Sequence, residues 1–355
     1  MKYALIGCGH IANNHVKAVK TNKLDFIAAC DIVPDNIEKL LTESDLQNQK
    51  KIFRYTDYKT LLLEHPEIEL IAITTSSGNH AKIALDCIDS GKNIIIEKPM
   101  AMSIKDANEI IKRSREKNVV VSVSHQNRFN YNVQKVRQAL DEGKFGKLSH
   151  GNICVRWNRN KSYYDQAKWR GTWLEDGGCL MNQCIHAIDL LIWMFGEEIE
   201  SVYGIIKKQI HNYIECEDVG IAILTFKNGA IATIEGTTNV YPKNLEETLC
   251  IFGEKGTVKL GGTSLNKIEA WNFADESMNK YLDKASKPDN INNYVHLYSD
   301  VVDSIIKHRK PYIDAIAGKN SLEVVLAIYK SSITGQQIKL PLTDCSTSDF
   351  ANIFK

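Results

Sequence analysis

Three polar residues recur at helical spacing within the apolar stretch 169–193. Asn182, His186 and Asp189 fall at i, i+4 and i+7, so they would share one face of a buried helix. Such a stripe needs partners, because an unpaired buried polar group costs about 1–3 kcal/mol. A lone histidine of this kind is usually a hydrogen-bonded core residue. An imidazole also titrates near neutral pH, which makes His186 a candidate general base. Asp189 lies one turn further on and is expected to be a structural hydrogen-bonding group.

Lys98 is the second candidate for chemistry. It stands between Glu97 and Pro99 at the end of an apolar segment, 93–100, that is predicted to be a strand. An ammonium group there could donate a hydrogen bond to a reacting oxygen and stabilise negative charge on it. The alternative is a structural lysine whose aliphatic stem lies along the strand end. A base and such a donor are what the oxidation of a secondary alcohol requires, provided that a cofactor accepts the hydride.

A glycine-rich turn near the N-terminus predicts that cofactor. Residues 2–7 read as a strand, and GCGHIA follows, with Gly7 and Gly9 in a GxGxxA pattern that opens a helix. The glycines allow a tight turn and a close backbone approach, and the helix N-terminus offers N–H groups to a pyrophosphate. His10 and Ile11 belong to the same turn and are predicted to line the cofactor.

Polar residues after two further strands extend this predicted site. One strand ends at Asp31, whose carboxylate could accept hydrogen bonds from ribose hydroxyls and would repel a 2′-phosphate, so we predict NAD rather than NADP. The alternative is a Rossmann-like domain that binds no nucleotide. Strand 68–75 is apolar on both faces, as a central parallel strand should be, and Thr75, Ser76 and His80 stand at or after its end, where the ligand crevice is expected.

The order of elements predicts two domains. Strands and helices alternate as far as residue 124, which indicates an α/β, doubly wound Rossmann domain over residues 1–124. The remainder, 125–355, is predicted to be an α+β domain with a large, mostly antiparallel open sheet, because its strands follow one another without crossover helices. Residues 272–291 are polar without a clear period and are expected to form a surface loop. The elements expected in this domain are a helix over 131–141, strands over 148–158, 200–210, 217–227, 230–240, 245–253 and 256–260, and helices over 292–307 and 319–333.

Composition excludes several classes of function. The chain has 355 residues and a formal net charge of +1 without a basic block, which argues against nucleic-acid binding through phosphate contacts. No apolar run approaches the length of a membrane span, and the N-terminus enters a strand directly rather than a signal peptide. The nine cysteines are scattered without a CxxC pair, so neither a metal site nor a disulfide framework is predicted. These features fit a cytoplasmic enzyme.

Taken together, these residues resemble the glucose–fructose oxidoreductase/inositol dehydrogenase (Gfo/Idh/MocA) family. The resemblance covers nearly the whole chain and rests on GCGHIA, on Asp31, on the segment 76–101 with its EKP motif and on the DGG…H..D stretch around His186. It implies a Rossmann domain that binds NAD(P) and a sheet domain whose helix places the catalytic histidine by the nicotinamide. It also implies a role for Glu97 at the nicotinamide ribose. Dimers or tetramers would form through the sheet face, and we predict a homotetramer.

The family often has an aspartate where this chain has Asn182. An amide cannot act as a base, so a Lys–Asp–His relay would be interrupted here, and Asn182 is expected to orient a substrate hydroxyl. The subgroup described next has an asparagine there too. Asn182→Asp is therefore expected to be tolerated better than the loss of Lys98 or His186.

A narrower resemblance, to the UDP-N-acetyl-2-amino-2-deoxyglucuronate 3-dehydrogenases of surface-polysaccharide pathways, lies in segments 156–159, 162–178 and 180–191. It implies a nucleotide-sugar uronate substrate, for which arginines would be the anion anchors. Trp169 and Arg170 could instead reach the cofactor pyrophosphate. The alternatives are a dehydrogenase of a free sugar or inositol-type polyol, which needs no anion anchors, and a non-catalytic NAD-binding sensor. The residues predicted to bind the substrate are Lys98, Arg128, Arg156, Arg159, Tyr163, Asn182 and His186.

Overall fold

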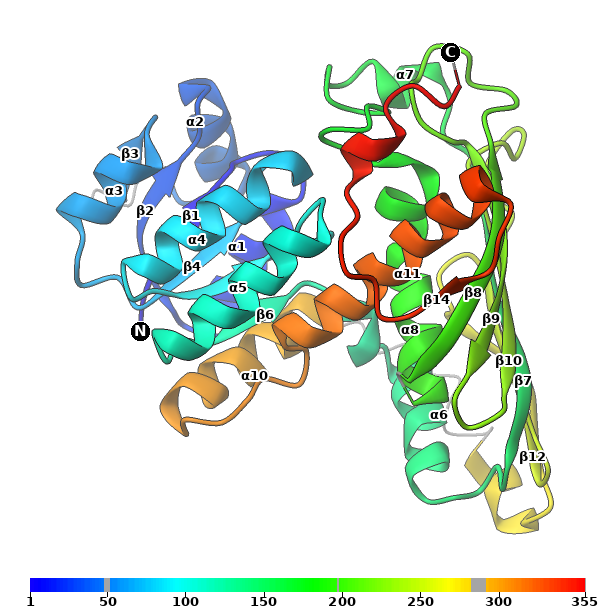
Figure 1. Ribbon diagram of the computed structural model, residues 1–355. Coiled ribbons are helices and arrows are strands. Elements are labelled where there is room, and N and C mark those ends of the chain that lie inside the picture. The colour runs from blue at the N-terminus through cyan, green and yellow to red at the C-terminus, as the bar shows by residue number, and fades with distance from the viewer. Residues whose placement is uncertain (48–51, 197, 282–291, 355) are drawn as a thin grey trace. The chain divides into compact units, whose positions relative to one another are not determined.

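The structure is a computed structural model that describes residues 1–47, 52–196, 198–281 and 292–354 (Figure 1). The chain divides into two compact units. The first comprises Met1–Gln126 and Ile291–Lys319, and the second comprises Asn127–Asn290 and Asn320–Lys355. The predicted boundary at residue 124 lies close to the first division. The prediction that everything after it belongs to the second domain is wrong, because the segment 291–319 returns to the first unit.

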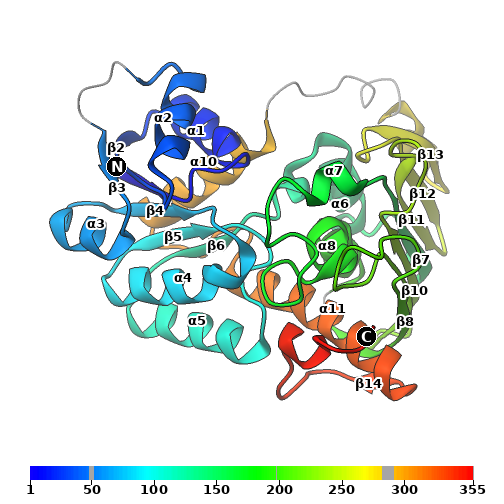
Figure 2. The same cartoon turned by 90° about the horizontal axis from the view of Figure 1, so that it is seen from above.

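The first unit is built on a six-stranded sheet in the order β3-β2-β1-β4-β5-β6, and all its strand pairs are parallel. Helices cover both faces, with α1 and α10 on one and α4 and α5 on the other (Figure 2). The doubly wound Rossmann fold predicted from the sequence is therefore confirmed. The strands are β1 (Lys2–Ile6), β2 (Asp25–Cys30), β3 (Phe53–Tyr55), β4 (Leu70–Ile73), β5 (Asn93–Ile96) and β6 (Val121–Val123). The helices are α1 (Ala12–Thr21), α2 (Pro34–Glu43), α3 (Tyr58–Glu64), α4 (His80–Asp89), α5 (Ile104–Glu116) and α10 (Asn293–Ile306).

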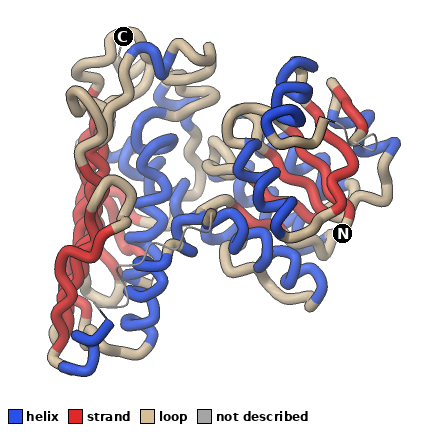
Figure 3. The backbone as a smooth tube through the Cα atoms, turned by 180° about the vertical axis from the view of Figure 1, so that it is seen from behind, coloured by secondary structure: helices blue, strands red, loops and turns tan. Residues whose placement is uncertain are grey.

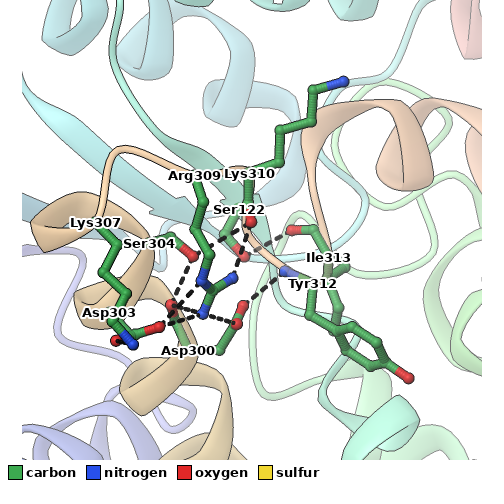
Figure 4. A network of polar contacts seen from close by, with 9 residues as sticks. All are labelled: Ser122, Asp300, Asp303, Ser304, Lys307, Arg309, Lys310, Tyr312 and Ile313. Carbon is green, nitrogen blue, oxygen red and sulfur yellow. Dashed lines mark hydrogen bonds and ion pairs between the residues drawn. The ribbon is translucent and has the colours of Figure 1, made fainter.

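The late segment packs onto the first unit through buried and polar contacts. The hydroxyl of Tyr298 in α10 lies 3.0 Å from that of Tyr3 in β1, inside the core. Beyond α10, Arg309 donates to the carboxylates of Asp300 and Asp303 and so closes the turn that follows the helix (Figure 4). The hydroxyl of Ser122 in β6 then donates to the carbonyl of Ile313 at 2.8 Å. Side chains far apart in the sequence thus add this segment to the edge of the sheet.

The second unit carries an eight-stranded sheet in the order β13-β12-β11-β7-β10-β9-β8-β14. Among the described strands of this sheet, only β7 and β10 pair in parallel, which confirms the mostly antiparallel sheet. β13 and β14 were missed, and η4 replaces part of the loop expected over 272–291, of which 282–291 lie outside the described residues. The strands are β7 (Leu148–Arg156), β8 (Ile199–Lys207), β9 (Val219–Phe226), β10 (Ile231–Thr237), β11 (Glu246–Gly253), β12 (Gly256–Gly261), β13 (Lys267–Phe273) and β14 (Ile338–Lys339). The helices include α6 (Tyr131–Asp141), α7 (Lys161–Tyr164), α8 (Ile185–Phe195), η4 (Glu276–Tyr281) and α11 (Ala315–Thr334).

The two faces of this sheet differ in chemistry. Helices cover one face, as the tube in Figure 3 shows, and the side chains that point to that face are buried. The other face exposes a cluster of large apolar side chains on neighbouring strands, with Tyr203 opposite Ile223 and Ile205 opposite Ile221. Each of these four is at least 42% exposed, and Ile231 on the next strand is 52% exposed. None of the described helices is long and apolar enough to cross a membrane.

This exposed cluster is the surface through which we expect two copies of the chain to associate. Ile221→Glu combined with Ile223→Glu should lower the mass measured by light scattering to that of a smaller assembly, because association would bury two unpaired charges. Leu63→Glu is the matched control, since this leucine is 82% exposed in the first unit. A wild type that is monomeric at micromolar concentration, or a double variant of unchanged mass, would contradict the prediction.

Candidate active site

The turn after β1 has the shape that a dinucleotide requires. Gly7 has φ +96°, and a Cβ on it would lie 2.6 Å from the carbonyl carbon of Thr74, so no larger residue fits. A Cβ on Gly9 would meet no atom within 4 Å, so its backbone is open to a ligand. His10 is exposed and Ile11 half-buried just before α1 begins. Open backbone at a helix N-terminus is what a pyrophosphate group binds, and these residues fit NAD.

Asp31 holds this turn as well as standing at the end of β2. Its Oδ2 accepts the backbone N–H of Cys8 at 2.7 Å, and its Oδ1 accepts from Val33 N at 2.9 Å and from Asn36 Nδ2 at 3.1 Å. A carboxylate oxygen can accept two hydrogen bonds, so Oδ2 retains the capacity to accept a ribose hydroxyl. The predicted role of Asp31 in selecting NAD therefore remains consistent with its contacts, and it gains a second role in shaping the glycine turn.

His80 has a different role from the one predicted. Its side chain is 1% exposed, and its two ring nitrogens lie 2.8 Å from the carbonyl oxygen of Pro99 and 3.0 Å from that of Thr75. Burial lowers the pKa of His80. The ring thus ties the end of β4 to the EKP turn, and we correct its assignment from a cofactor contact to a residue that positions its neighbours. Thr75 and Ser76 are half-buried at the strand end, and their cofactor contacts stay predictions.

Glu97 is also engaged inside the first unit. Its Oε1 accepts from the hydroxyl of Tyr294 at 2.8 Å and lies 3.0 Å from Nε2 of His15, while Oε2 lies 3.3 Å from the backbone nitrogen of Lys98. The carboxylate is 5% exposed. A buried group with these partners fits a ribose contact poorly, so we correct Glu97 to a structural anchor of the turn. Lys98 itself is half-buried at the turn. Sequence reasoning missed His15 and Tyr294, which carry no local motif.

The second unit contains the helix that carries His186. It begins as a π-helix, Cys179–Cys184, and continues as α8. Along residues 179–195, only Asn182, Gln183 and His186 are not buried. Asp189 points elsewhere: it is 1% exposed, and both its oxygens accept from Arg128 at 2.8 Å. The expected structural role of Asp189 is confirmed. Its place on the polar stripe was wrong, and Gln183, which was missed, belongs there instead.

A distant glutamate holds the start of this helix. Gly178, with φ +91°, provides no capping side chain, and Glu217 supplies the missing acceptors. Its backbone oxygen accepts from Cys179 N at 3.2 Å and its Oε1 from Leu180 N at 2.8 Å. The hydroxyl of Tyr329 in α11 also contacts Oε1 at 2.8 Å. Burial raises the pKa of Glu217 to about 8.

Hydrogen bonds join the half-buried side chains of Asn182 and Gln183 to the loop that precedes the helix. Gln183 accepts from Nε of Arg159 at 2.8 Å, and its Nε2 donates to Asn182 Oδ1 at 3.0 Å and to the hydroxyl of Tyr163 at 2.8 Å. Asn182 Nδ2 donates to the carboxylate of Asp176, and Nη1 of Arg170 donates to Tyr163. With both its acceptor positions used, the hydroxyl of Tyr163 keeps its own hydrogen to donate. The structure thus brings together Arg159, Tyr163, Arg170 and Asn182.

Charge pairing separates the four arginines that were candidates for anion binding. Arg128 is buried against Asp189, and Arg156 pairs with Glu235 at 2.6 Å and with Glu246 on the open face of the sheet. Both arginines already have carboxylate partners, so their assignments as substrate anchors are wrong. Arg159 and Arg170 form no ion pair with any described residue.

Both of these unpaired arginines stack on aromatic rings. Their guanidinium carbons lie 5.2 Å and 4.2 Å from the ring centre of Tyr163, and that of Arg170 is also 4.8 Å from Trp169. They are the remaining candidates for holding an anion. The predicted contact of Trp169 and Arg170 with the cofactor pyrophosphate stays a prediction.

Comparison with known proteins places the chain in a family. Residues 1–125 match the model of an oxidoreductase family with an NAD-binding Rossmann fold, and residues 133–259 match the GFO/IDH/MocA C-terminal domain. The chain belongs to the Gfo/Idh/MocA family. A WlbA dehydrogenase from Chromobacterium violaceum, solved in complex with NADH and UDP-GlcNAcA, is 33% identical over 96% of each chain, with a TM-score of 0.88.

Two further relatives have related activities in their names. The WlbA dehydrogenase of Bordetella pertussis, also solved with NADH and UDP-GlcNAcA, is 33% identical over 96% of this chain and 98% of its own, with a TM-score of 0.87. A myo-inositol 2-dehydrogenase of Thermotoga maritima is 22% identical over 96% of this chain and 98% of its own. This member of the Gfo/Idh/MocA family is therefore an NAD-dependent oxidoreductase of the sugar dehydrogenase type.

The position of Asp31 predicts how this Gfo/Idh/MocA protein selects its nucleotide. Wild type should bind NADH more tightly than NADPH, and Asp31→Ser should narrow the difference, because it removes the charge that repels a 2′-phosphate. Dissociation constants from the quenching of protein fluorescence measure this. Asp35→Ser, a change of an exposed aspartate in α2, is the matched control. Tighter binding of NADPH by the wild type would refute the prediction.

Proposed function

We propose that the protein oxidises C3 of UDP-N-acetylglucosaminuronate with NAD, in the biosynthesis of a surface-polysaccharide sugar. The observation that carries this proposal is the pair of arginines, Arg159 and Arg170, without a carboxylate partner among the described residues. A buried or half-buried guanidinium without a counter-charge favours an anionic ligand. The two WlbA dehydrogenases that were solved with UDP-GlcNAcA support the choice of a nucleotide-sugar uronate.

In this proposal, His186 and Lys98 act on the hydroxyl group that is oxidised. NAD supplies the hydride acceptor. His186 takes the hydroxyl proton, which a positioned base accelerates by about 10²–10⁴-fold. Lys98 donates a hydrogen bond to the same oxygen and stabilises the negative charge that develops on it. Asn182, fixed by Gln183 and Asp176, orients the sugar, and the hydroxyl of Tyr163 donates to a substrate oxygen.

The second candidate is a dehydrogenase of a free polyol. It is favoured by curated relatives that are named inositol dehydrogenases, at 22% identity. A neutral polyol leaves Arg159 and Arg170 without a counter-charge, which is why we rank it second. A panel of inositols and UDP-sugars with NAD, followed at the absorbance of NADH, separates the two candidates.

The carboxylate of the substrate should be essential. Wild type should form NADH with UDP-N-acetylglucosaminuronate and very little with UDP-N-acetylglucosamine, which carries CH₂OH in place of the carboxylate. A charge-assisted hydrogen bond contributes about 1.5–3 kcal/mol, or about ten- to a hundredfold in affinity. An unpaired arginine in the site adds to the rejection of the neutral sugar. Comparable kcat/KM for the two sugars would exclude the uronate proposal.

Matched arginine variants locate the anchor. Arg159→Ala and Arg170→Ala should each raise KM for the uronate by about ten- to a hundredfold. Arg156→Ala is the control, because this arginine pairs with Glu235 and Glu246 on the open face of the sheet, and it should leave KM within twofold. An equal effect of all three substitutions would show that net charge alone, and not a site, determines the affinity.

Loss of the side chain of Lys98 or of His186 should strongly reduce turnover without weakening the binding of the cofactor. Lys98→Ala and His186→Ala should each reduce kcat by about 10²-fold or more, while the dissociation constant of NADH stays within about threefold. Steady-state kinetics and fluorescence titration measure the two quantities. A His186→Ala variant with nearly full turnover at saturating substrate would exclude His186 as the base.

A further inference from the structure

We propose that Asp176 is a positioning residue for Asn182, and that this pair requires one carboxylate and one amide. The inference rests on the proposed role of Asn182 at the substrate. Asp176 precedes the two glycines that lead into the histidine helix, is 3% exposed and is absent from the sequence-based site. Its Oδ2 accepts from the backbone N–H of Gly171 at 2.6 Å, and its Oδ1 accepts from Nδ2 of Asn182.

A series of hydrogen bonds runs from Arg159 to Asp176, and the groups at its two ends fix the direction of every bond in it. Arg159 can only donate, so the group of Gln183 that faces it must be the oxygen. The NH₂ of Gln183 then points to Asn182, which must present its oxygen on that side and its NH₂ on the other. An ionised carboxylate can only accept, so Asp176 is the matching end. The chain Arg159–Gln183–Asn182–Asp176 has one consistent orientation and runs from cation to anion.

This arrangement sets the position and the orientation of the Asn182 amide. Asp176 is itself held by the backbone of Gly171, in the loop that also carries Arg170. Any movement of that loop therefore reaches Asn182 through two hydrogen bonds. A displacement of about 1 Å in a group that orients a substrate can reduce the rate about 10²-fold. The Asp176–Asn182 pair thus links the loop that carries Arg170 to the helix that carries His186.

An aspartate at position 182 breaks the arrangement. Asn182→Asp replaces the donor that faces Asp176 with a second carboxylate, so two like charges would meet at hydrogen-bonding distance. The sequence predicted that this substitution is tolerated better than the loss of Lys98 or His186, and the contact with Asp176 gives a physical reason why it should still reduce turnover. Asp176→Asn alone also fails, because its NH₂ would then face the NH₂ of Asn182 while its oxygen keeps the hydrogen bond from Gly171.

The double substitution restores the hydrogen bond within the pair and those to Gly171 and Gln183. In Asp176→Asn with Asn182→Asp, the oxygen of residue 176 still accepts from Gly171, and its NH₂ donates to the new carboxylate at 182. That carboxylate also accepts from the NH₂ of Gln183. The charge of the pair is unchanged, and only its position moves by one side chain.

The experiment compares four full-length proteins: wild type, the two single variants and the double variant. Each single variant should lose at least tenfold in kcat, with KM for NAD within twofold. The double variant should recover to within about threefold of wild type. Asp165→Asn is the control: this exposed aspartate of the same loop pairs with Lys161 and should leave kcat unchanged. Melting temperatures identify any variant that fails to fold.

The outcomes are distinct. Recovery by the double variant supports the pairing, because independent defects would multiply. A double variant that is worse than both single variants, or a folded Asn182→Asp protein with wild-type kcat, overturns it. If the wild type oxidises a neutral polyol and not the UDP-uronate, the proposed function fails. The same four proteins are then assayed with that polyol, and the pairing is still tested.

Discussion

A helix that is buried on nearly every side must find partners for its few polar groups, and this requirement determines the contacts around Asn182, Gln183 and His186. Residues 179–195 leave only Asn182, Gln183 and His186 unburied. The free N–H groups at the start of the helix bond to Glu217, which stands just before β9, because Gly178 has no side chain to cap them. A Cβ at Gly178 would lie 1.8 Å from Oε2 of Glu217. The glycine is therefore required by the cap, and the cap fixes where the helix that carries His186 begins.

In the first unit, histidines are the partners of buried polar groups. His80 bridges the carbonyls of Thr75 and Pro99, and His15 lies between Glu97 and Tyr298. Both rings are buried, and each contacts a residue next to Lys98: His15 contacts Glu97, and His80 contacts the carbonyl of Pro99. Sequence motifs identify Lys98 readily, but the groups that hold it come from α1, α4 and α10. The segment around Lys98 is thus placed by buried polar contacts that are spread over much of the unit.

The fold could be predicted from the sequence, whereas the partners of polar side chains could not. Periodicity locates strands and helices because it reflects local burial, so the Rossmann sheet and most strands of the second sheet were correct. The segment 291–319 was assigned to the wrong domain because an amphipathic helix does not reveal which core it covers. Arg128 and Arg156 were assigned as anchors because an arginine in a motif looks the same whether or not a carboxylate meets it. Asp189, Glu235 and Glu246, which neutralise them, are 61, 79 and 90 residues away in the sequence.

The presence or absence of a carboxylate partner distinguishes arginines that look alike in the sequence. A guanidinium that has a carboxylate partner is already satisfied, and a ligand would have to break that pair before binding. Arg159 and Arg170 instead lie against aromatic rings, which hold a planar cation in place without neutralising it. Their hydrogen bonds go to neutral acceptors, the Gln183 oxygen and the Tyr163 hydroxyl among them. The two guanidinium groups are thus oriented without an ion pair to any described residue, which leaves them able to pair with an added anion. The sequence contains many arginines, and it is the set of their partners that distinguishes the two suited to bind a substrate.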